Sequence, residues 1–208
     1  METLRFRNGL NTETRKKENK MRIFNEDIDV AAERGHTEEV IELIENGINP
    51  NLADGRGRTP LHKAAFWGHA KTAKALVEHG ANANARNELR ETPLHIAAEY
   101  DQVETVEVLL DLKPNIIDKK DLCGNTALHW ATMNDCPETV KVLIERGANI
   151  NIENEIGRLA VDYANDDGVK KLFQNADKIR ADYLALHPKK ISRYRAKLNR
   201  SLKTKQNG

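Results

Sequence analysis

The sequence TPLHKAA at residues 59–65 returns as TPLHIAA at 92–98 and as TALHWAT at 126–132. These copies begin 33 and then 34 residues apart, a spacing typical of solenoids built from short structural repeats. A degraded copy begins at Leu159, and residues 28–32 occupy the same place one period before the first copy. The sequence therefore predicts five consecutive units.

Each copy is followed by a second apolar pattern, with residues at i, i+3 and i+4 on one face of a helix. The four sets are Val40, Ile41, Leu43 and Ile44; Ala73, Leu76 and Val77; Val106, Leu109 and Leu110; and Val140, Leu143 and Ile144. Glycines such as Gly35 and Gly68 separate the paired helices, and Gly47, Gly80 and Gly147 end the second ones. Each unit is predicted to be a helix, a turn and a helix.

The pattern resembles the ankyrin repeat, D-x-x-G-x-T-P-L-H-x-A-A-x-x-G-H followed by V-x-x-L-L-x-x-G-A-x-x-N. The residues in phase include Asp54, Gly57, Thr59 to His62, Gly68, His69, Gly80, Ala81 and Asn84, and the resemblance covers about residues 25–176. It implies an all-α ankyrin-repeat solenoid of about five helix-turn-helix units joined by hairpin-like loops.

The residue types in each copy suit these places. Pro60 and Pro93 fit the first helical turn, where no amide donor is needed, and Thr59, Thr92 and Thr126 fit the capping position before it. The alanine pairs allow the two helices to approach closely, and Leu61, Leu94 and Leu128 fill the space towards the next unit.

Several positions depart from the pattern. Arg90 replaces a loop glycine, Asp101 and Asp135 replace the glycine between helices, and Lys113-Pro114 replaces Gly-Ala. The loop at residues 117–125 is expected to be one residue longer. We therefore expect the third and fourth units to be less regular, with a changed loop geometry.

Charge is distributed unevenly along the chain. The whole chain has a formal net charge of +1, but residues 1–24 carry seven Lys or Arg against three acids, and residues 189–208 carry eight against none. The remaining body is left at about −11. The sequence thus predicts an acidic folded body with two basic ends.

These patterns suggest a domain organisation. Residues 1–22 are expected to be a basic, disordered extension, residues 23–187 an ankyrin-repeat domain, and residues 188–208 a basic amphipathic or disordered tail. The units are placed at about 23–53, 54–86, 87–120, 121–153 and 154–187. Apolar residues at helical spacing from Val169 to Leu186 predict one long final helix that caps the last repeat.

Motifs for catalysis are missing from the repeat region. Serine occurs only at Ser192 and Ser201, so no serine triad is available there. Gly55-Arg56-Gly57 lacks the third glycine of a phosphate loop and reads better as a hairpin tip. We predict no enzymatic activity, no small-molecule substrate and no cofactor.

The histidines and cysteines have a structural interpretation. Since His62, His95 and His129 recur at one place in successive repeats, they should lie too far apart to share a metal ion. The resemblance implies that each is hydrogen-bonded between repeats instead. Cys123 and Cys136 are expected to be free thiols.

The resemblance also implies where a partner protein binds. In ankyrin repeats the two residues after the alanine pair and the hairpin tips face the concave surface. From these positions we select the predicted partner-binding residues Arg56, Arg58, Phe66, Trp67, Leu89, Tyr100, Leu122 and Met133. Trp, Tyr and Arg dominate many protein interfaces, so Trp67 and Tyr100 are the leading candidates. The alternative is that Phe66 and Trp67 only pack against neighbouring repeats, as expected for the more buried Trp130 and Tyr163.

The C-terminal tail supports a second hypothesis. Ile191, Tyr194, Leu198 and Leu202 follow helical spacing, with Lys190, Arg193, Lys197 and Arg200 between them. This basic pattern is compatible with binding to anionic lipid or nucleic acid, with the repeats as a platform, or with docking in a partner's groove. A disordered, solubilising extension, or one that rests on the acidic body, is the other interpretation.

No signal peptide or long apolar segment is found in the sequence. We expect a monomeric, cytoplasmic protein.

Overall fold

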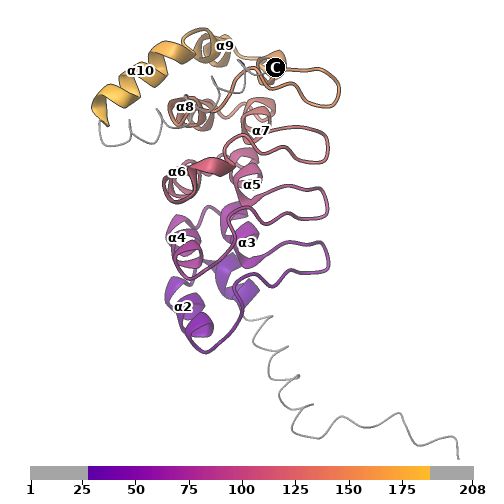
Figure 1. Cartoon of the computed structure of the whole chain (residues 1–208), viewed down its shortest axis with the longest axis vertical. Helices are drawn as coiled ribbons and strands as arrows, with labels where there is room; N and C mark the ends of the chain where they lie inside the picture. The colour runs from indigo at the N-terminus through magenta and orange to yellow at the C-terminus, as the bar shows by residue number, and fades with distance from the viewer. Residues whose placement is uncertain (1–27, 188–208) are drawn as a thin grey trace, which may run out of the picture.

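The computed structural model of the chain describes residues 28–187, which form two rows of stacked helices (Figure 1). The inner row comprises helical residues 28–34, α3 (Pro60–Phe66), α5 (Pro93–Glu99) and α7 (Ala127–Met133). The outer row comprises α2 (Thr37–Glu45), α4 (Ala70–Glu78), α6 (Val103–Leu112) and α8 (Pro137–Glu145). Helix α5 packs between α3 and α7, and α6 packs between α4 and α8. The predicted all-α repeat solenoid is confirmed.

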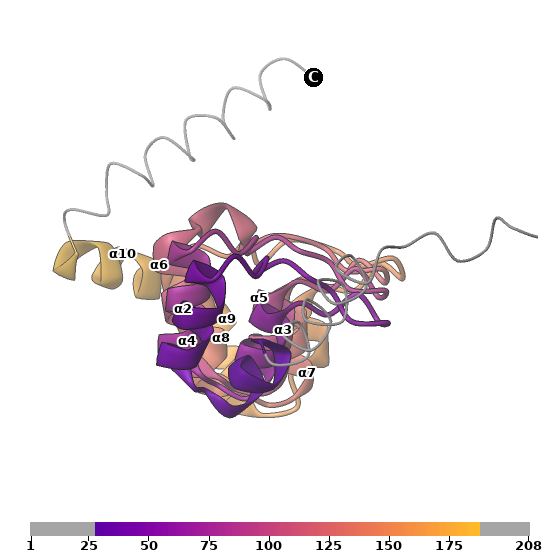
Figure 2. The same cartoon turned by 90° about the horizontal axis from the view of Figure 1, so that it is seen from below.

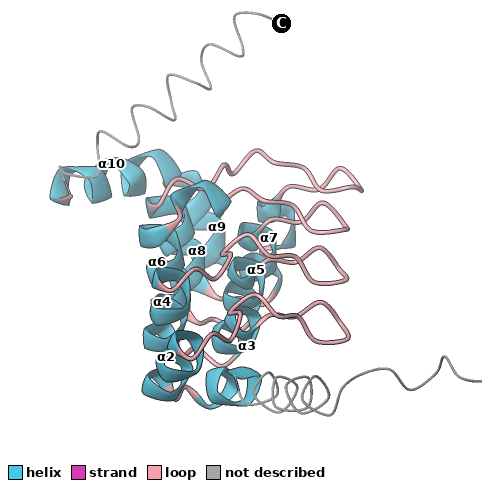
Figure 3. Cartoon of the chain, turned by 60° about the horizontal axis from the view of Figure 1, so that its bottom comes forward, coloured by secondary structure: helices cyan, strands magenta, loops and turns pink. Residues whose placement is uncertain are grey.

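Hairpin-like loops join the units and project to one side of the stack (Figures 2 and 3). Each of the four is closed by a backbone hydrogen bond of 2.9–3.0 Å, from the N–H of its first residue to the carbonyl of its fifth. The four loops are Asp54–Arg58, Asn87–Glu91, Asp121–Asn125 and Asn154–Arg158. The side chain of each first residue also accepts N–H groups of the loop, which explains why only Asp and Asn occupy this position.

The histidine of each complete repeat bridges two units. In the first copy, Nδ1 of His62 accepts the N–H of Thr59 at 3.1 Å, while Nε2 lies 3.1 Å from the carbonyl oxygen of Glu91 in the next hairpin. Because a backbone N–H only donates and a carbonyl only accepts, Nε2 carries the proton and the ring is neutral. The same arrangement recurs in the next two copies, where Nε2 of His95 meets the carbonyl of Asn125 and Nε2 of His129 meets that of Arg158, both at 3.2 Å. The inter-repeat histidines implied by the resemblance are confirmed.

Small and large apolar residues alternate in the core as expected. Leu61, Leu94 and Leu128 are at most 1% exposed, and the alanine pairs of α3 and α5 are fully buried. Thr59, Thr92 and Thr126 precede their helices in extended conformation and form capping boxes with the histidines. The cap, the bridge and the core contact therefore all come from one short sequence block.

The expected change of loop geometry occurs at Lys113-Pro114, where a 3-10 turn replaces the Gly-Ala ending, but not at the substituted glycines. Arg90, Asp101 and Asp135 adopt φ of 60°, 53° and 51°, close to the glycine values of 72–78° at the equivalent positions of other units. The backbone keeps the repeat geometry and accepts the cost of a left-handed residue with a side chain. Stacking on both sides thus overrides the local preference.

The expected longer loop at residues 117–125 is also wrong. Hairpin Asp121–Asn125 has the same five residues as the others, and Asp118 accepts the N–H of Asn149 as Asn51 accepts that of Asn82. The extra residue lies earlier, where α6 is one residue longer than α4 and a short 3-10 helix, η1 (Pro114–Ile116), replaces the Gly-Ala turn. A proline after the helix and two buried isoleucines, Ile116 and Ile117, fix this alternative ending.

The C-terminal end differs from the predicted single long helix. In the last unit the first helix is a 3-10 turn, η2 (Ala160–Tyr163), and the cap consists of α9 (Asp167–Gln174) and α10 (Ala176–Leu186). The break falls at Asn175, whose side chain donates to the carbonyl of Lys171 at 2.8 Å and satisfies the end of α9. Helix α10 then packs on α8, and Arg180 donates to the carbonyl of Ala148 at 2.9 Å.

The bridging histidines predict a loss of stability in mild acid. Burial lowers the pKa of His62 to about 4 and also lowers the pKa of His95 and His129. Below pH 6.5 these histidines bind protons in the unfolded chain but stay neutral in the folded chain, so stability is lost as the pH falls towards 4. For His62 alone the loss reaches about 3 kcal/mol at pH 4.

Urea unfolding at pH 7, 6 and 5, followed by circular dichroism, measures this loss. Asp29, Glu99 and Glu145 act in the opposite direction, because burial raises the pKa of each carboxyl, to about 6 for Asp29. We expect the three histidines to outweigh them. A His62→Gln variant should show a shallower pH dependence. Equal midpoints at pH 7 and pH 5 would contradict the expectation.

The left-handed residues predict stabilising substitutions. Arg90→Gly and Asp135→Gly should each raise the free energy of unfolding by about 0.5–1 kcal/mol, because the relief of backbone strain exceeds the entropy that glycine adds to the unfolded chain. Asp101→Gly should raise the free energy of unfolding little, since the Asp101 carboxylate accepts the hydroxyl of Thr139 in the next unit at 2.7 Å. Urea titration of the three variants compares them, and equal gains at all three positions would refute the argument.

Candidate protein-binding surface

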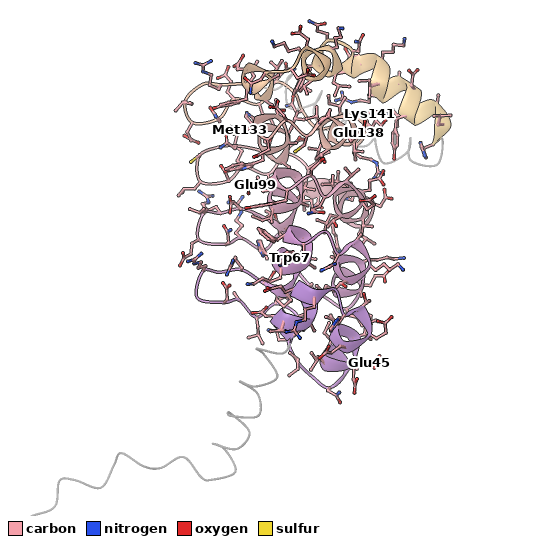
Figure 4. The ribbon with its side chains drawn as sticks, turned by 180° about the vertical axis from the view of Figure 1, so that it is seen from behind. Glu45, Trp67, Glu99, Met133, Glu138 and Lys141 are labelled. Atoms are coloured by element: carbon pink, nitrogen blue, oxygen red, sulfur yellow. The ribbon has the colours of Figure 1, made fainter. Side chains whose placement is uncertain are left out.

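A groove of about 580 Å³ lies beside α3 and α5, where the hairpins of the second and third units approach the inner helices. Six of the eight predicted partner-binding residues line it: Arg56, Arg58, Phe66, Trp67, Leu89 and Tyr100. Leu122 and Met133 lie outside it, one unit further along the stack. Figure 4 labels Trp67, Glu99 and Met133, which follow one another along the inner row of helices.

Three aromatic rings form the apolar part of the groove. The ring centroid of Phe66 lies 5.1 Å from that of Trp67, edge to face, and 4.3 Å from that of Tyr100. Phe66 is half-buried against the core, whereas Trp67 and Tyr100 remain 52% and 45% exposed. The alternative that both Phe66 and Trp67 are packing residues thus describes Phe66 only, and Phe66 supports the two exposed rings from below.

Apolar side chains also lie at the hairpin tips. Leu89, Leu122 and Ile156 are 57%, 55% and 76% exposed, and Cys123 is exposed beside Leu122. Backbone hydrogen bonds join the tips, from Leu122 N–H to the Leu89 carbonyl at 2.9 Å and from Glu155 N–H to the Cys123 carbonyl at 3.0 Å. The tips therefore form a continuous edge, while Met133 is half-buried on α7.

Two of the three Lys and Arg residues that line the groove are paired with acids of the chain itself. Arg58 binds the Asp54 carboxylate at 2.8 Å, and Lys63 lies 3.7–3.8 Å from the carboxylates of Asp54 and Glu33. Although burial alone would raise the pKa of Asp54, hydrogen bonds from the backbone and side chain of Arg58 and from Arg56 lower it. The Arg56 guanidinium, in contrast, has no bonded partner within residues 28–187.

Four residues of the groove lining lie outside the positions predicted to face the concave surface, namely His62, Lys63, Asn87 and Ile96. Lys63 and Ile96 follow the histidine, at a position predicted to lie in the core because Trp130 and Tyr163 occupy it in later units. A lysine at an otherwise apolar position was the available signal. Trp130 and Tyr163 are half-buried and hold hairpins to helices, through a 2.9 Å bond from Trp130 to Asp121 and a 2.8 Å bond from Asn154 to the Tyr163 hydroxyl.

Residues 28–187 contain no group of three or more His, Cys, Asp or Glu placed to hold a metal ion. In the same part of the chain, no helix has the length and apolar character required to cross a bilayer. The predicted lipid- or nucleic-acid-binding residues Lys190, Arg193, Lys197 and Arg200 lie outside the described residues, as does the N-terminal extension. The tail hypothesis stays a prediction.

Comparison with known families agrees with this geometry. The family described as ankyrin repeats (3 copies) matches residues 28–87, 84–154 and 112–183, which is most of the chain. No individual curated protein matches. The chain belongs to the ankyrin-repeat family, whose members generally mediate protein–protein interactions and are typically non-enzymatic scaffolds.

The two cysteines should differ in reactivity. Cys123 is exposed at a hairpin tip, whereas Cys136 is 5% exposed and burial raises the pKa of its thiol to about 11. Because the thiolate is the reactive form, iodoacetamide at pH 8 should alkylate Cys123 in the native protein and Cys136 only after unfolding. Peptide mass spectrometry locates the adduct, and native labelling of Cys136 at a comparable rate would contradict the assignment.

Proposed function

We propose that the protein is a non-enzymatic scaffold that binds a partner protein on its concave surface, with the groove of the second and third units as the centre of the interface. The observation that carries this proposal is the exposure of Trp67 and Tyr100 around one groove. Exposed aromatic residues that gather in a concave site are typical of interaction surfaces.

The rigidity of the groove favours the same function. Its wall hairpins are joined by a bond from the Glu88 N–H to the Arg56 carbonyl at 3.1 Å, and His62 ties the hairpin of the third unit to α3. A surface ordered before binding loses little conformational entropy when a partner docks. Replacement of a contact residue is therefore expected to act mainly on the dissociation rate.

The double variant Trp67→Ala, Tyr100→Ala tests the proposal. Both side chains are about half exposed, so the variant should fold, while the loss of two central anchors should weaken partner binding at least about 30-fold. Affinity purification with quantitative mass spectrometry identifies partners of the wild type, and surface plasmon resonance then measures their binding.

Glu45→Ala, Lys141→Ala is the matched control. Both residues are exposed on the outer helices α2 and α8, away from the groove (Figure 4). This control should retain all partners. If a folded Trp67→Ala, Tyr100→Ala variant also retains every partner at wild-type affinity, the groove is not the interface.

A further inference from the structure

Excess negative charge in the groove points to the chemistry of the partner. Glu91 and Glu99 both line the groove beside Tyr100 and Ile96. Burial and the neighbouring Glu91 carboxylate raise the pKa of Glu99, and burial and both carboxylates raise the pKa of Tyr100. The two acids are thus close enough to repel each other.

Glu91 is buried with one oxygen unused. The side chain is 6% exposed, and its Oε2 accepts the side-chain amide of Asn87. Its Oε1 receives no hydrogen bond from residues 28–187, and no cation within that range pairs with either Glu91 or Glu99. Oε1 is not among the buried unpaired atoms of the described residues, so this oxygen faces the solvent of the groove and is accessible to a ligand.

Equivalent positions of other units show that the two acids lack a counter-charge. One unit earlier, Arg58 occupies the place of Glu91 and is paired with Asp54, whereas Glu91 faces a neutral Asn87. Glu33 occupies the place of Glu99 two units earlier, and it lies 3.8 Å from Lys63 of the unit that follows it. In the unit that follows Glu99, the place of this lysine is taken by Trp130. Glu99 therefore lacks the cation that its counterpart Glu33 has, and Glu91 replaces a residue that is itself a cation.

The net charge of the groove lining follows from these ion pairs. With Arg58 and Lys63 neutralised internally, the lining keeps three carboxylates without a cation, on Glu88, Glu91 and Glu99, against the one guanidinium of Arg56. The carboxylates lie beside aromatic rings, which also attract cations through their faces. An incoming cation would gain from both.

We propose that the partner inserts a lysine or arginine side chain into this groove, with its charged end at Glu91 and Glu99 and its aliphatic stem along Phe66 and Tyr100. This inference rests on the proposed function and specifies its ligand. The occupant is a segment of another protein in which a basic residue lies next to an apolar one, because Trp67 and Leu89 border the same groove.

Random dodecapeptides displayed on phage, selected on the full-length protein, supply the probe. Enriched peptides should contain Lys or Arg beside an apolar residue, and a synthetic copy should bind with an affinity measurable by fluorescence anisotropy. Glu99→Gln should weaken this binding about tenfold, whereas Glu45→Gln, the same charge change on outer helix α2, should leave it unchanged. A norleucine in place of the peptide lysine should cause at least a similar loss on the wild type and a clearly smaller loss on Glu99→Gln, where only Glu91 remains to meet the cation.

The outcomes separate the two proposals. If Trp67→Ala leaves peptide binding intact, or no peptide is enriched, the groove itself is not a binding site and both proposals fail. Two other results would keep the groove as the binding site but refute the inserted basic side chain. In the first, Trp67→Ala abolishes binding but Glu99→Gln behaves as Glu45→Gln does; in the second, the peptides are acidic and depend on Arg56.

One other source of basic residues is the chain itself. A synthetic peptide of residues 188–208, which carries Lys190 and Arg193 among its basic residues, is added as a competitor. The tail also places basic residues beside apolar ones, as at Lys190-Ile191 and Lys197-Leu198, so this competition tests the choice of occupant directly. The partner proposal expects no displacement of the selected peptide at equal concentration. Displacement that depends on Glu99 would assign the groove to the chain's own C-terminus and overturn the partner proposal.

Discussion

The hydrogen bond from a buried histidine to the next hairpin is the interaction on which the rest of the structure depends. In each complete repeat it joins the start of an inner helix to the last residue of the following hairpin, for example from His62 to the Glu91 carbonyl. The same ring caps its own helix by accepting the N–H of Thr59. Both bonds require a neutral imidazole in one tautomer. Helix start, hairpin base and unit spacing are consequently set together, and the walls of the groove are fixed by the framework.

A fixed framework allows the remaining positions to vary without loss of the fold. The pair Asp54 and Arg58 becomes Asn87 and Glu91 one unit later, with the hairpin still closed by a bond of 3.0 Å. Only the charge offered to the groove changes. Binding chemistry in this chain is therefore encoded by the differences between units, while the shape of the surface is encoded by what they share.

The sequence predicts features that depend on a local pattern repeated several times. These are the period, the capping threonines, the bridging histidines and the core leucines. What could not be predicted depends on contacts across units. The left-handed conformation of Arg90 is imposed by stacking against its own preference, and the ion pair of Lys63 with Glu33 joins residues whose proximity exists only in the folded stack. The position of the extra residue before Asp118 and the break at Asn175 are set by side-chain contacts, Ile116 and Ile117 in the first case and the Asn175 amide in the second. For the site, the aromatic residues could be selected by type, but the missing counter-charge of Glu99 is visible only from the pairs formed in other units.

Stability and recognition use different residues of this molecule. The aromatic side chains that rise from the groove contribute little to the core, since Trp67 is 52% exposed, and their apolar surface is an unfavourable feature of the isolated chain. The groove lies in the second and third units, away from the C-terminal cap, where Arg146 binds Glu107 and Asp111 and lies 5.3 Å from the ring of Tyr183. Because the stack transmits order from unit to unit, the cap stabilises the groove without contacting it. A substitution in the groove should therefore alter affinity with little effect on folding, and this separation is what makes the concave surface free to carry specificity.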